Sequence, residues 1–174
     1  MSEKTASRWY AVYVKSRYEK KTSKLLEDRH IETYLPLIGR LKQWSDRKKM
    51  VEEPLFKSYL FVHTDLKNYF EILNTPGIVK FITFEGKPVP VPENQLVAVK
   101  EFIGEYDGEE SLEQYQELRE GQTVEIVYGH MKGLIGRLVE TRGKQRVMVD
   151  IEAVGQSLPI NISRSQIRLL KNGL

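Results

Sequence analysis

Apolar and polar positions in the first part of the chain predict strands that alternate with helices. Residues 8–15 are rich in aromatic and β-branched side chains, so they predict a strand. Because side chains alternate between the two faces of a strand, Trp9 and Tyr13 are expected on one face and Tyr10 and Val12 on the other. The strand therefore presents an aromatic side and a mainly aliphatic side.

A basic helix is predicted directly after this strand. Residues 18–29 carry many charges, and Leu25 and Leu26 are the main apolar positions among them, which favours a helix lying on the surface. Ser16 is followed three residues later by Glu19, the spacing of a capping box. The sequence thus predicts that Ser16 caps this helix.

The pattern up to residue 104 predicts a mostly antiparallel sheet with helices over one face, an α/β sandwich. Further predicted elements are strands at 32–38, 59–63 and 78–84, helices at 65–74 and 92–103, turns at 75–77 and 85–87, and a polar, basic hairpin or loop at 40–49. Trp44 lies inside the basic hairpin or loop.

The last part of the chain has a different pattern, in which glycines separate short β-branched segments. Strands are predicted at 123–128, 134–140, 146–151, 158–162 and 167–170. So small a sheet hides its edges only by closing on itself, which predicts a small barrel. The fold class is therefore α+β, and the glycine-rich barrel is expected to be stable, without an all-helical alternative.

Charge marks the junction between these two parts. Residues 1–104 carry a net charge of +5, residues 105–120 of −6 and residues 121–174 of +4, in a chain of 174 residues with a net charge of +3. An acidic, apolar-poor strip is typical of a linker. We therefore predict an N-terminal domain over 7–104, a linker over 105–120 and a barrel over 121–174.

Composition excludes several classes of protein and of site. The chain has no cysteine, which excludes disulfides and thiolate metal sites and agrees with a cytoplasmic location. No apolar run approaches the roughly 20 residues of a membrane span. His30, His63 and His130 are scattered, and phosphate-loop and nucleophile-elbow motifs are absent. We expect no enzyme activity, no metal and no cofactor.

Two motifs together resemble a known family. Trp9-Tyr10 with Pro54-Leu-Phe-Lys-Ser-Tyr-Leu-Phe-Val62 is similar to the N-terminal domain of the NusG family of transcription elongation and antitermination factors. Residues 127–136, Val-Tyr-Gly-His-Met-Lys-Gly-Leu-Ile-Gly, are similar to the KOW motif of that family's C-terminal SH3-like barrel. Within the family, residues 15–20 and 54–62 look closer to the specialised RfaH and UpxY-type antiterminators of long operons, such as those for capsular polysaccharide. Lys57 stands where the family usually has proline.

The resemblance implies a surface that binds the clamp helices of RNA polymerase. The residues expected there are Trp9, Tyr13, Phe56, Tyr59 and Phe61. Tyr59 and Phe61 share one face of their strand by the period of two, and Tyr13 joins them if the strands are neighbours. The alternative is that these rings form buried core.

The resemblance also implies contact of the predicted helix with the non-template DNA strand or nascent RNA. The residues expected there are Lys15, Arg17, Tyr18, Lys20, Lys21 and Lys24. Tyr18 among these cations suits stacking on an unpaired base, while a merely solvated helix face is the alternative. A second basic and aromatic segment, with the same two interpretations, contains Arg40, Lys42, Trp44, Arg47, Lys48 and Lys49.

The resemblance also implies a further partner on the barrel, either a ribosomal protein or the termination factor Rho. The chain is expected to be monomeric. Residues Gly133-Leu-Ile-Gly136 also match the Gly-x-x-Gly loop of KH domains, but that loop joins two helices and strands are predicted here. The rival function is a ribosome-associated or RNA-binding KOW protein that does not contact polymerase. Gene context would separate a specialised factor from a housekeeping one.

Overall fold

The computed structural model describes residues 6–106, 108, 121–141 and 144–170. Internal contacts divide the chain into two units. One comprises the chain up to Gly39 together with Val51–Val91, and the other comprises Arg40–Met50 and the chain from Pro92 onwards. Most of the acidic strip predicted as a linker lies outside the described residues.

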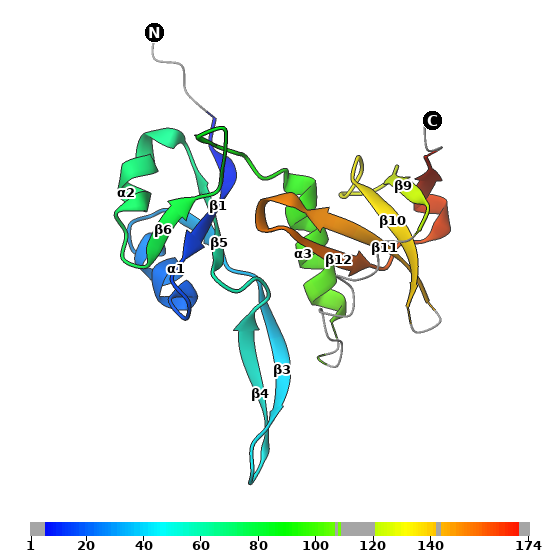
Figure 1. Ribbon diagram of the computed structural model, residues 1–174, viewed down its shortest axis with the longest axis horizontal. Helices are drawn as coiled ribbons and strands as arrows, with labels where there is room; N and C mark the ends of the chain where they lie inside the picture. Colours follow the sequence, from blue (N-terminus) through cyan, green and yellow to red (C-terminus); the bar gives the residue numbers. More distant parts are fainter. Residues whose placement is uncertain (1–5, 107, 109–120, 142–143, 171–174) are drawn as a thin grey trace. The chain divides into compact units, whose positions relative to one another are not determined.

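The first unit contains an antiparallel sheet whose strands lie in the order β2-β5-β1-β6. These strands are β1 (Arg8–Val14), β2 (Glu32–Tyr34), β5 (Tyr59–Thr64) and β6 (Ile78–Phe81). β1 is central, because it pairs with both β5 and β6 (Figure 1). The condition for Tyr13 to join Tyr59 and Phe61, that the two strands are neighbours, is thus met.

Helices cover the aliphatic face of this sheet. They are α1 (Glu19–Glu27) and the short α2 (Tyr69–Leu73), which follows the 3-10 turn η1 (Leu66–Asn68). Val12 of β1 and Leu60 of β5 are fully buried with Leu26 of α1 and Ile72 of α2 in one core cluster. Alternation along β1 therefore directs one set of side chains into this core and leaves the aromatic set on the other face.

Two hairpins complete the strands before α3. β3 (Leu37–Gln43) and β4 (Lys48–Pro54) form a two-stranded ribbon, so the predicted basic segment is a hairpin (Figure 1). β7 (Thr83–Phe84) and β8 (Lys87–Pro88) form a much smaller one. In its turn both Glu85 and Gly86 have positive φ, the geometry of a tight hairpin turn.

The second unit contains a five-stranded antiparallel sheet in the order β12-β11-β10-β9-β13. Its strands are β9 (Thr123–Ile126), β10 (Ile135–Thr141), β11 (Lys144–Ile151), β12 (Gln156–Ile160) and β13 (Ile167–Leu169). Short 3-10 turns, η2 (Glu152–Val154) and η3 (Arg164–Gln166), precede the last two strands. The predicted α+β class, with a small C-terminal β domain of five strands, is confirmed.

The helix α3 (Glu93–Glu105) packs against β11 and β12 of the second unit. The side chain of Asn161, just after β12, donates a hydrogen bond to Glu105 Oε2 at 2.7 Å. On β11, Val147, Met148 and Val149 are all buried, so this strand is covered on both faces. The predicted placement of this helix over the N-terminal sheet differs from this packing, because an apolar helical stripe does not specify the surface that it covers.

Candidate functional site

The face of the N-terminal sheet opposite α1 and α2 is lined with aromatic rings. The registers place Tyr13 across from Tyr59, Trp9 across from His63, and Tyr34 across from Phe61. Phe56, which precedes β5, packs edge-on to Phe61 at 6.1 Å between centroids. We call this surface the aromatic face, and its members are Trp9, Tyr13, Tyr34, Phe56, Tyr59 and Phe61.

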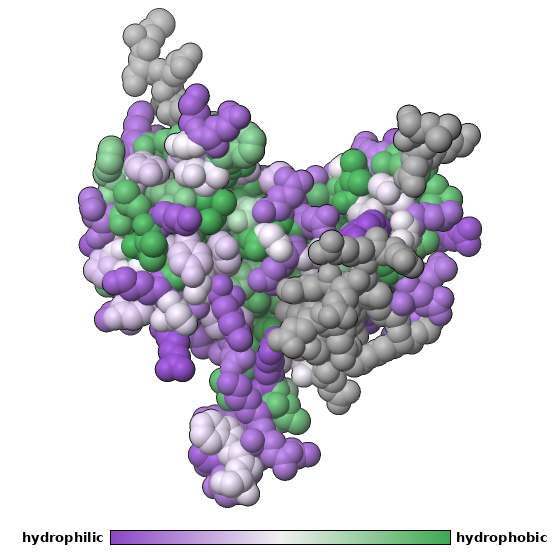
Figure 2. Space-filling view, viewed as in Figure 1, coloured by the Kyte–Doolittle hydropathy of each residue, from purple (hydrophilic) through white to green (hydrophobic). Residues whose placement is uncertain are grey.

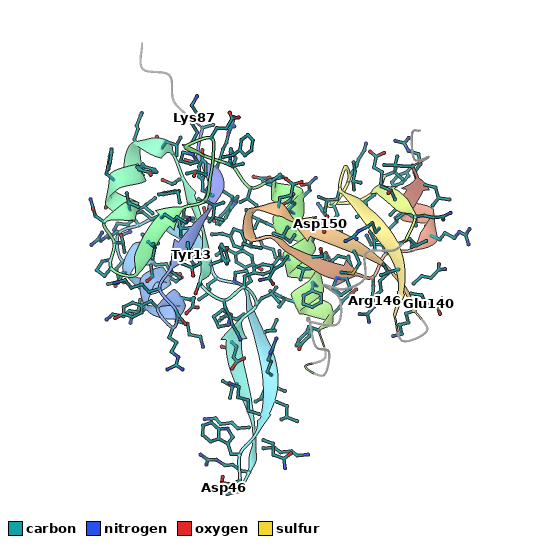
Figure 3. All side chains as sticks on the ribbon, viewed as in Figure 1. Tyr13, Asp46, Lys87, Glu140, Arg146 and Asp150 are labelled. Carbon is teal, nitrogen blue, oxygen red and sulfur yellow. The ribbon has the colours of Figure 1, made fainter. Side chains whose placement is uncertain are left out.

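The aromatic face has a buried part and an accessible part. Phe56 and Phe61 are 1% and 0% exposed, whereas Tyr13 is 36% exposed and Tyr59 is half-buried. The Tyr13 and Tyr59 rings meet edge to face, with centroids 5.5 Å apart, and Tyr13 lies on β1 (Figure 3). Of the five rings predicted to bind polymerase, Phe56 and Phe61 are therefore core in this structure. A partner surface is open at Tyr13 and Tyr59.

Trp9 and Tyr34 extend the aromatic face along the strands. Trp9 is half-buried and stacks on His63 at 5.0 Å, and Tyr34 stacks on Phe61 at 6.2 Å. Burial raises the pKa of the Tyr34 phenol to about 12. Tyr34 was not predicted on this face, because its place there depends on the β2–β5 pairing. The alternation of β5 would have placed His63, the stacking partner of Trp9, on the side of Tyr59 and Phe61.

All six residues predicted to bind nucleic acid lie together and are exposed. We call this group the basic helix start, and its members are Lys15, Arg17, Tyr18, Lys20, Lys21 and Lys24. The ammonium of Lys21 lies 5.5 Å from the centre of the Tyr18 ring, a cation–π contact. Among the described residues, no carboxylate forms an ion pair with these cations. The cluster can thus offer its charges to an anionic partner.

The turn at residues 75–77 anchors the basic helix start. The N–H of Lys15 donates to Gly77 O at 2.8 Å, and the Thr22 hydroxyl donates to Pro76 O at 3.0 Å. Gly77 has φ +98°, and a Cβ there would lie 2.1 Å from Thr22 Oγ1 and 3.1 Å from the Tyr18 ring. Close approach of this backbone therefore requires glycine and positions Tyr18.

The predicted capping box at this helix is wrong. Tyr18 occupies the N-cap without a side-chain cap hydrogen bond, and the helix begins at Glu19. The Glu19 side chain is buried, and its Oε1 accepts a hydrogen bond at 2.8 Å from the N–H of Ser58. Arg17 has φ +67°, which lies outside the helical region. The chain therefore turns sharply between Ser16 and the first residue of the helix.

Lys57 stands at the position where the resemblance leads one to expect proline. It is exposed in the turn next to Ser58.

The second predicted segment forms the outer half of the β3–β4 hairpin. Every residue from Leu41 to Met50 is exposed, and the Trp44 N–H donates to Arg47 O at 2.8 Å across the tip. Figure 3 labels Asp46 at the tip, and Figure 2 shows that hydrophilic residues cover most of the hairpin surface. We call residues 40–50 the basic ribbon.

The glycines of residues 127–136 are structural. Gly129 and Gly133 have φ of +82° and +91° in the turn between β9 and β10. A Cβ on Gly136 would lie 2.4 Å from Met148 O, so β10 and β11 can approach only because Gly136 lacks a side chain. Strands, not helices, flank this loop, which excludes the KH arrangement.

Neither a metal-binding cluster nor a membrane-spanning helix occurs among the described residues. No group of three or more His, Cys, Asp or Glu side chains among them is arranged to hold a metal ion. Within the same residues, none of the helices is both long enough and apolar enough to cross a membrane.

Comparison with known proteins identifies the family of this chain. The family model described as "Transcription termination factor nusG" matches residues 7–100. The transcription termination/antitermination protein NusG of Thermus thermophilus is 28% identical over 91% of this chain and 96% of that protein. The NusG protein of Staphylococcus carnosus is 27% identical over 98% of this chain and all of that protein.

A solved structure described as "Domain interaction in Thermotoga maritima NusG" is 22% identical, with a TM-score of 0.49, and covers 95% of this chain and 98% of that one. The family match covers more than half of the sequence, including the sheet that carries the aromatic face and the helix that carries the basic helix start. The chain belongs to the NusG family of transcription termination and antitermination factors.

Proposed function

We propose that this chain binds RNA polymerase and suppresses pausing or termination during elongation. The observation that supports this most directly is the pair of Tyr13 and Tyr59, two accessible rings in edge-to-face contact on the sheet face that also carries the buried Phe61. Accessible aromatic rings on a rigid base are the side chains that most often anchor protein interfaces. Their rigidity reduces the conformational entropy lost on binding.

In this proposal the clamp helices of polymerase lie across the aromatic face. Each ring that a partner fully buries contributes about 1.5–3 kcal/mol. Trp9 and Tyr34, both half-buried, extend the same surface, while Phe56 and Phe61 hold the strands and the preceding turn beneath it. The proposed anchor is therefore Tyr13 and Tyr59, with Trp9 at the border.

The basic helix start is proposed to hold the non-template strand or nascent RNA. Its exposed cations suit phosphates, and Tyr18 is 39% exposed among them, which allows a base to stack on its ring. Stacking of this kind contributes about 1–3 kcal/mol per base. The Lys21 contact with the Tyr18 ring limits the conformations of Tyr18 and so favours this geometry.

Suppression of pausing follows if the chain binds the active conformation of polymerase better than the paused one. A preference of about 1.4 kcal/mol changes the ratio of the two states tenfold. The barrel, connected through the predicted acidic linker, is proposed to recruit a ribosomal protein or Rho at a raised effective concentration. These events take place in the cytoplasm.

We further propose that the factor is a specialised paralogue that acts on long operons, such as those for capsular polysaccharide. Its support is the likeness of residues 15–20 and 54–62 to RfaH and UpxY-type antiterminators. Deletion of the gene followed by sequencing of total RNA tests this. Loss of promoter-distal transcript in one or a few long operons is expected, whereas a change across most operons would indicate a housekeeping factor.

Capture of purified core RNA polymerase by the full-length chain tests the anchor. The Tyr13→Ala/Tyr59→Ala variant is expected to lose capture, while a Phe84→Ala/Tyr128→Ala variant, which removes two other exposed rings, retains it. Circular dichroism of both variants should match the wild type. Phe61 is unsuitable for this test, because truncation of a buried ring costs about 3–5 kcal/mol of stability. Equal capture by both folded variants would remove this face from the mechanism, and no capture by the wild type would favour an RNA-binding KOW protein.

A further inference from the structure

The basic ribbon is a narrow, two-stranded projection whose outer residues contact solvent on both faces. Residues 41–50 are all exposed, including Leu41, Trp44 and Met50 at 55–58%. Residues 40–50 carry five cations against one carboxylate, Asp46, so the segment has a net charge of +4. It is therefore one of the most strongly charged parts of a chain whose total is +3.

The hairpin register gives the ribbon two different faces. Hydrogen bonds from Trp44 N–H to Arg47 O and from Leu55 N–H to Pro36 O show that the two strands pair without a shift. Lys42 then lies across from Lys49, and Leu41 across from Met50. By alternation, the face of Lys42 also carries the side chains of Arg40, Trp44, Arg47 and Lys49, whereas the opposite face carries Leu41, Lys48 and Met50. Four of the five cations therefore share one face.

The cationic face favours a polyanion as its partner. Four cations and an indole on one side of the ribbon match the residue types that contact nucleic-acid backbones and bases. An acidic protein surface would use the charges but would not need the exposed Trp44.

The width of the ribbon selects among nucleic acids. A two-stranded β-ribbon enters the major groove of B-form DNA, which is about 12 Å wide. The major groove of A-form RNA is too narrow and deep for side chains to read. Four residues of β3 lie in the ribbon, which gives its paired part a length of about 14 Å at about 3.4 Å per residue, comparable with the width of the groove.

We infer that the basic ribbon is a second nucleic-acid site, which binds duplex DNA by inserting into the major groove with its cationic face on the phosphates. This goes beyond the proposed function, because it concerns double-stranded DNA and requires no polymerase. The basic helix start, by contrast, is a helix terminus with a ring suited to an unpaired base. The chain therefore offers separate surfaces for single-stranded and double-stranded nucleic acid.

Binding of the full chain to a labelled DNA duplex of about 20 base pairs, two helical turns, tests this by fluorescence anisotropy over a range of salt concentrations. The Lys42→Ala/Arg47→Ala/Lys49→Ala variant removes three cations of the face. The Lys80→Ala/Lys87→Ala/Lys144→Ala variant removes three exposed lysines elsewhere and serves as the charge-matched control. Trp44→Ala is compared with Phe84→Ala in the same way.

The ribbon variant is expected to reduce the slope of log K against log salt by about 2 to 3, about 0.9 for each lost phosphate contact, while the control changes it by less than about 1. Equal slopes in the two variants would overturn the inference, as would tighter wild-type binding to an RNA duplex or a single strand of equal length. The ribbon variant should still capture polymerase through Tyr13 and Tyr59. Duplex binding and polymerase capture are therefore measured separately, so failure of this inference can be distinguished from failure of the proposed function.

Discussion

The carboxylate of Glu19 accepts a hydrogen bond from the backbone N–H of Ser58 at 2.8 Å. Glu19 is the first residue of α1, and Ser58 lies directly before β5 with φ +66°. This one buried contact connects the basic helix start to the strand that presents Tyr59. The two proposed binding surfaces of the first unit therefore share a structural support.

Replacement of Glu19 should weaken this support. Glu19→Ala leaves the buried Ser58 N–H without its acceptor, and hydrogen bonds to charged groups contribute about 1.5–3 kcal/mol, so a loss of that size in unfolding free energy is expected. Urea unfolding followed by tryptophan fluorescence measures it, since Trp9 lies in the same sheet. Glu101→Ala, at an exposed position of α3, is the control and should change stability by less than about 0.5 kcal/mol. Equal stability of the two variants would show that the contact contributes little.

Removal of charge from the basic helix start should weaken binding to single-stranded nucleic acid. The Lys15→Ala/Lys21→Ala/Lys24→Ala variant is expected to lower the salt slope by about 2, about 0.7 for each lost contact on a single strand. The Lys80→Ala/Lys87→Ala/Lys144→Ala variant is again the control. A slope that does not differ between the two variants would support a solvated helix face as the role of these lysines.

Two glycine substitutions should have opposite effects. Gly136→Ala places a Cβ 2.4 Å from Met148 O and 2.6 Å from Val147 Cγ1, so the β10–β11 pair must separate and the barrel loses stability. Gly104→Ala meets nothing within 4 Å and lies in α3, where alanine is favoured over glycine by about 1 kcal/mol. Thermal unfolding should show a lower midpoint for the first variant and an equal or higher one for the second. A Gly136→Ala barrel as stable as the wild type would contradict the close packing.

Tyr34 should make stability depend on alkaline pH. Its pKa is raised by burial from 10.0 to about 12, so the folded state holds the phenolic proton more tightly than the unfolded state does. The resulting stability is fully present below pH 10 and is lost as the pH rises toward 12. Comparison of urea unfolding across this range with Tyr34→Phe, which has no phenolic proton, measures the effect. If the phenolate absorbance of the wild type shows no tyrosine that titrates well above pH 10, the prediction is contradicted.

The local sequence pattern was sufficient to predict most helices and strands and most residues of the candidate surfaces. Alternation in residues 8–14 predicted which residues of β1 share a face, because a strand has a fixed period of two. Glycines between β-branched segments predicted the five strands of the second unit. The cations of the basic helix start and the basic ribbon were also evident from the sequence, since charged side chains rarely enter a core.

Burial, caps and helix placement were decided only by the tertiary structure. Tyr59 and Phe61 have the same parity on β5, yet Phe61 is buried and Tyr59 is accessible, because what covers a strand face depends on residues distant in sequence. Glu19 has the spacing of a capping-box residue but binds the Ser58 N–H, 39 residues away. The apolar stripe of α3 predicted a helix with one buried face. The strands that it packs against, β11 and β12, are distant in sequence, and periodicity does not specify them.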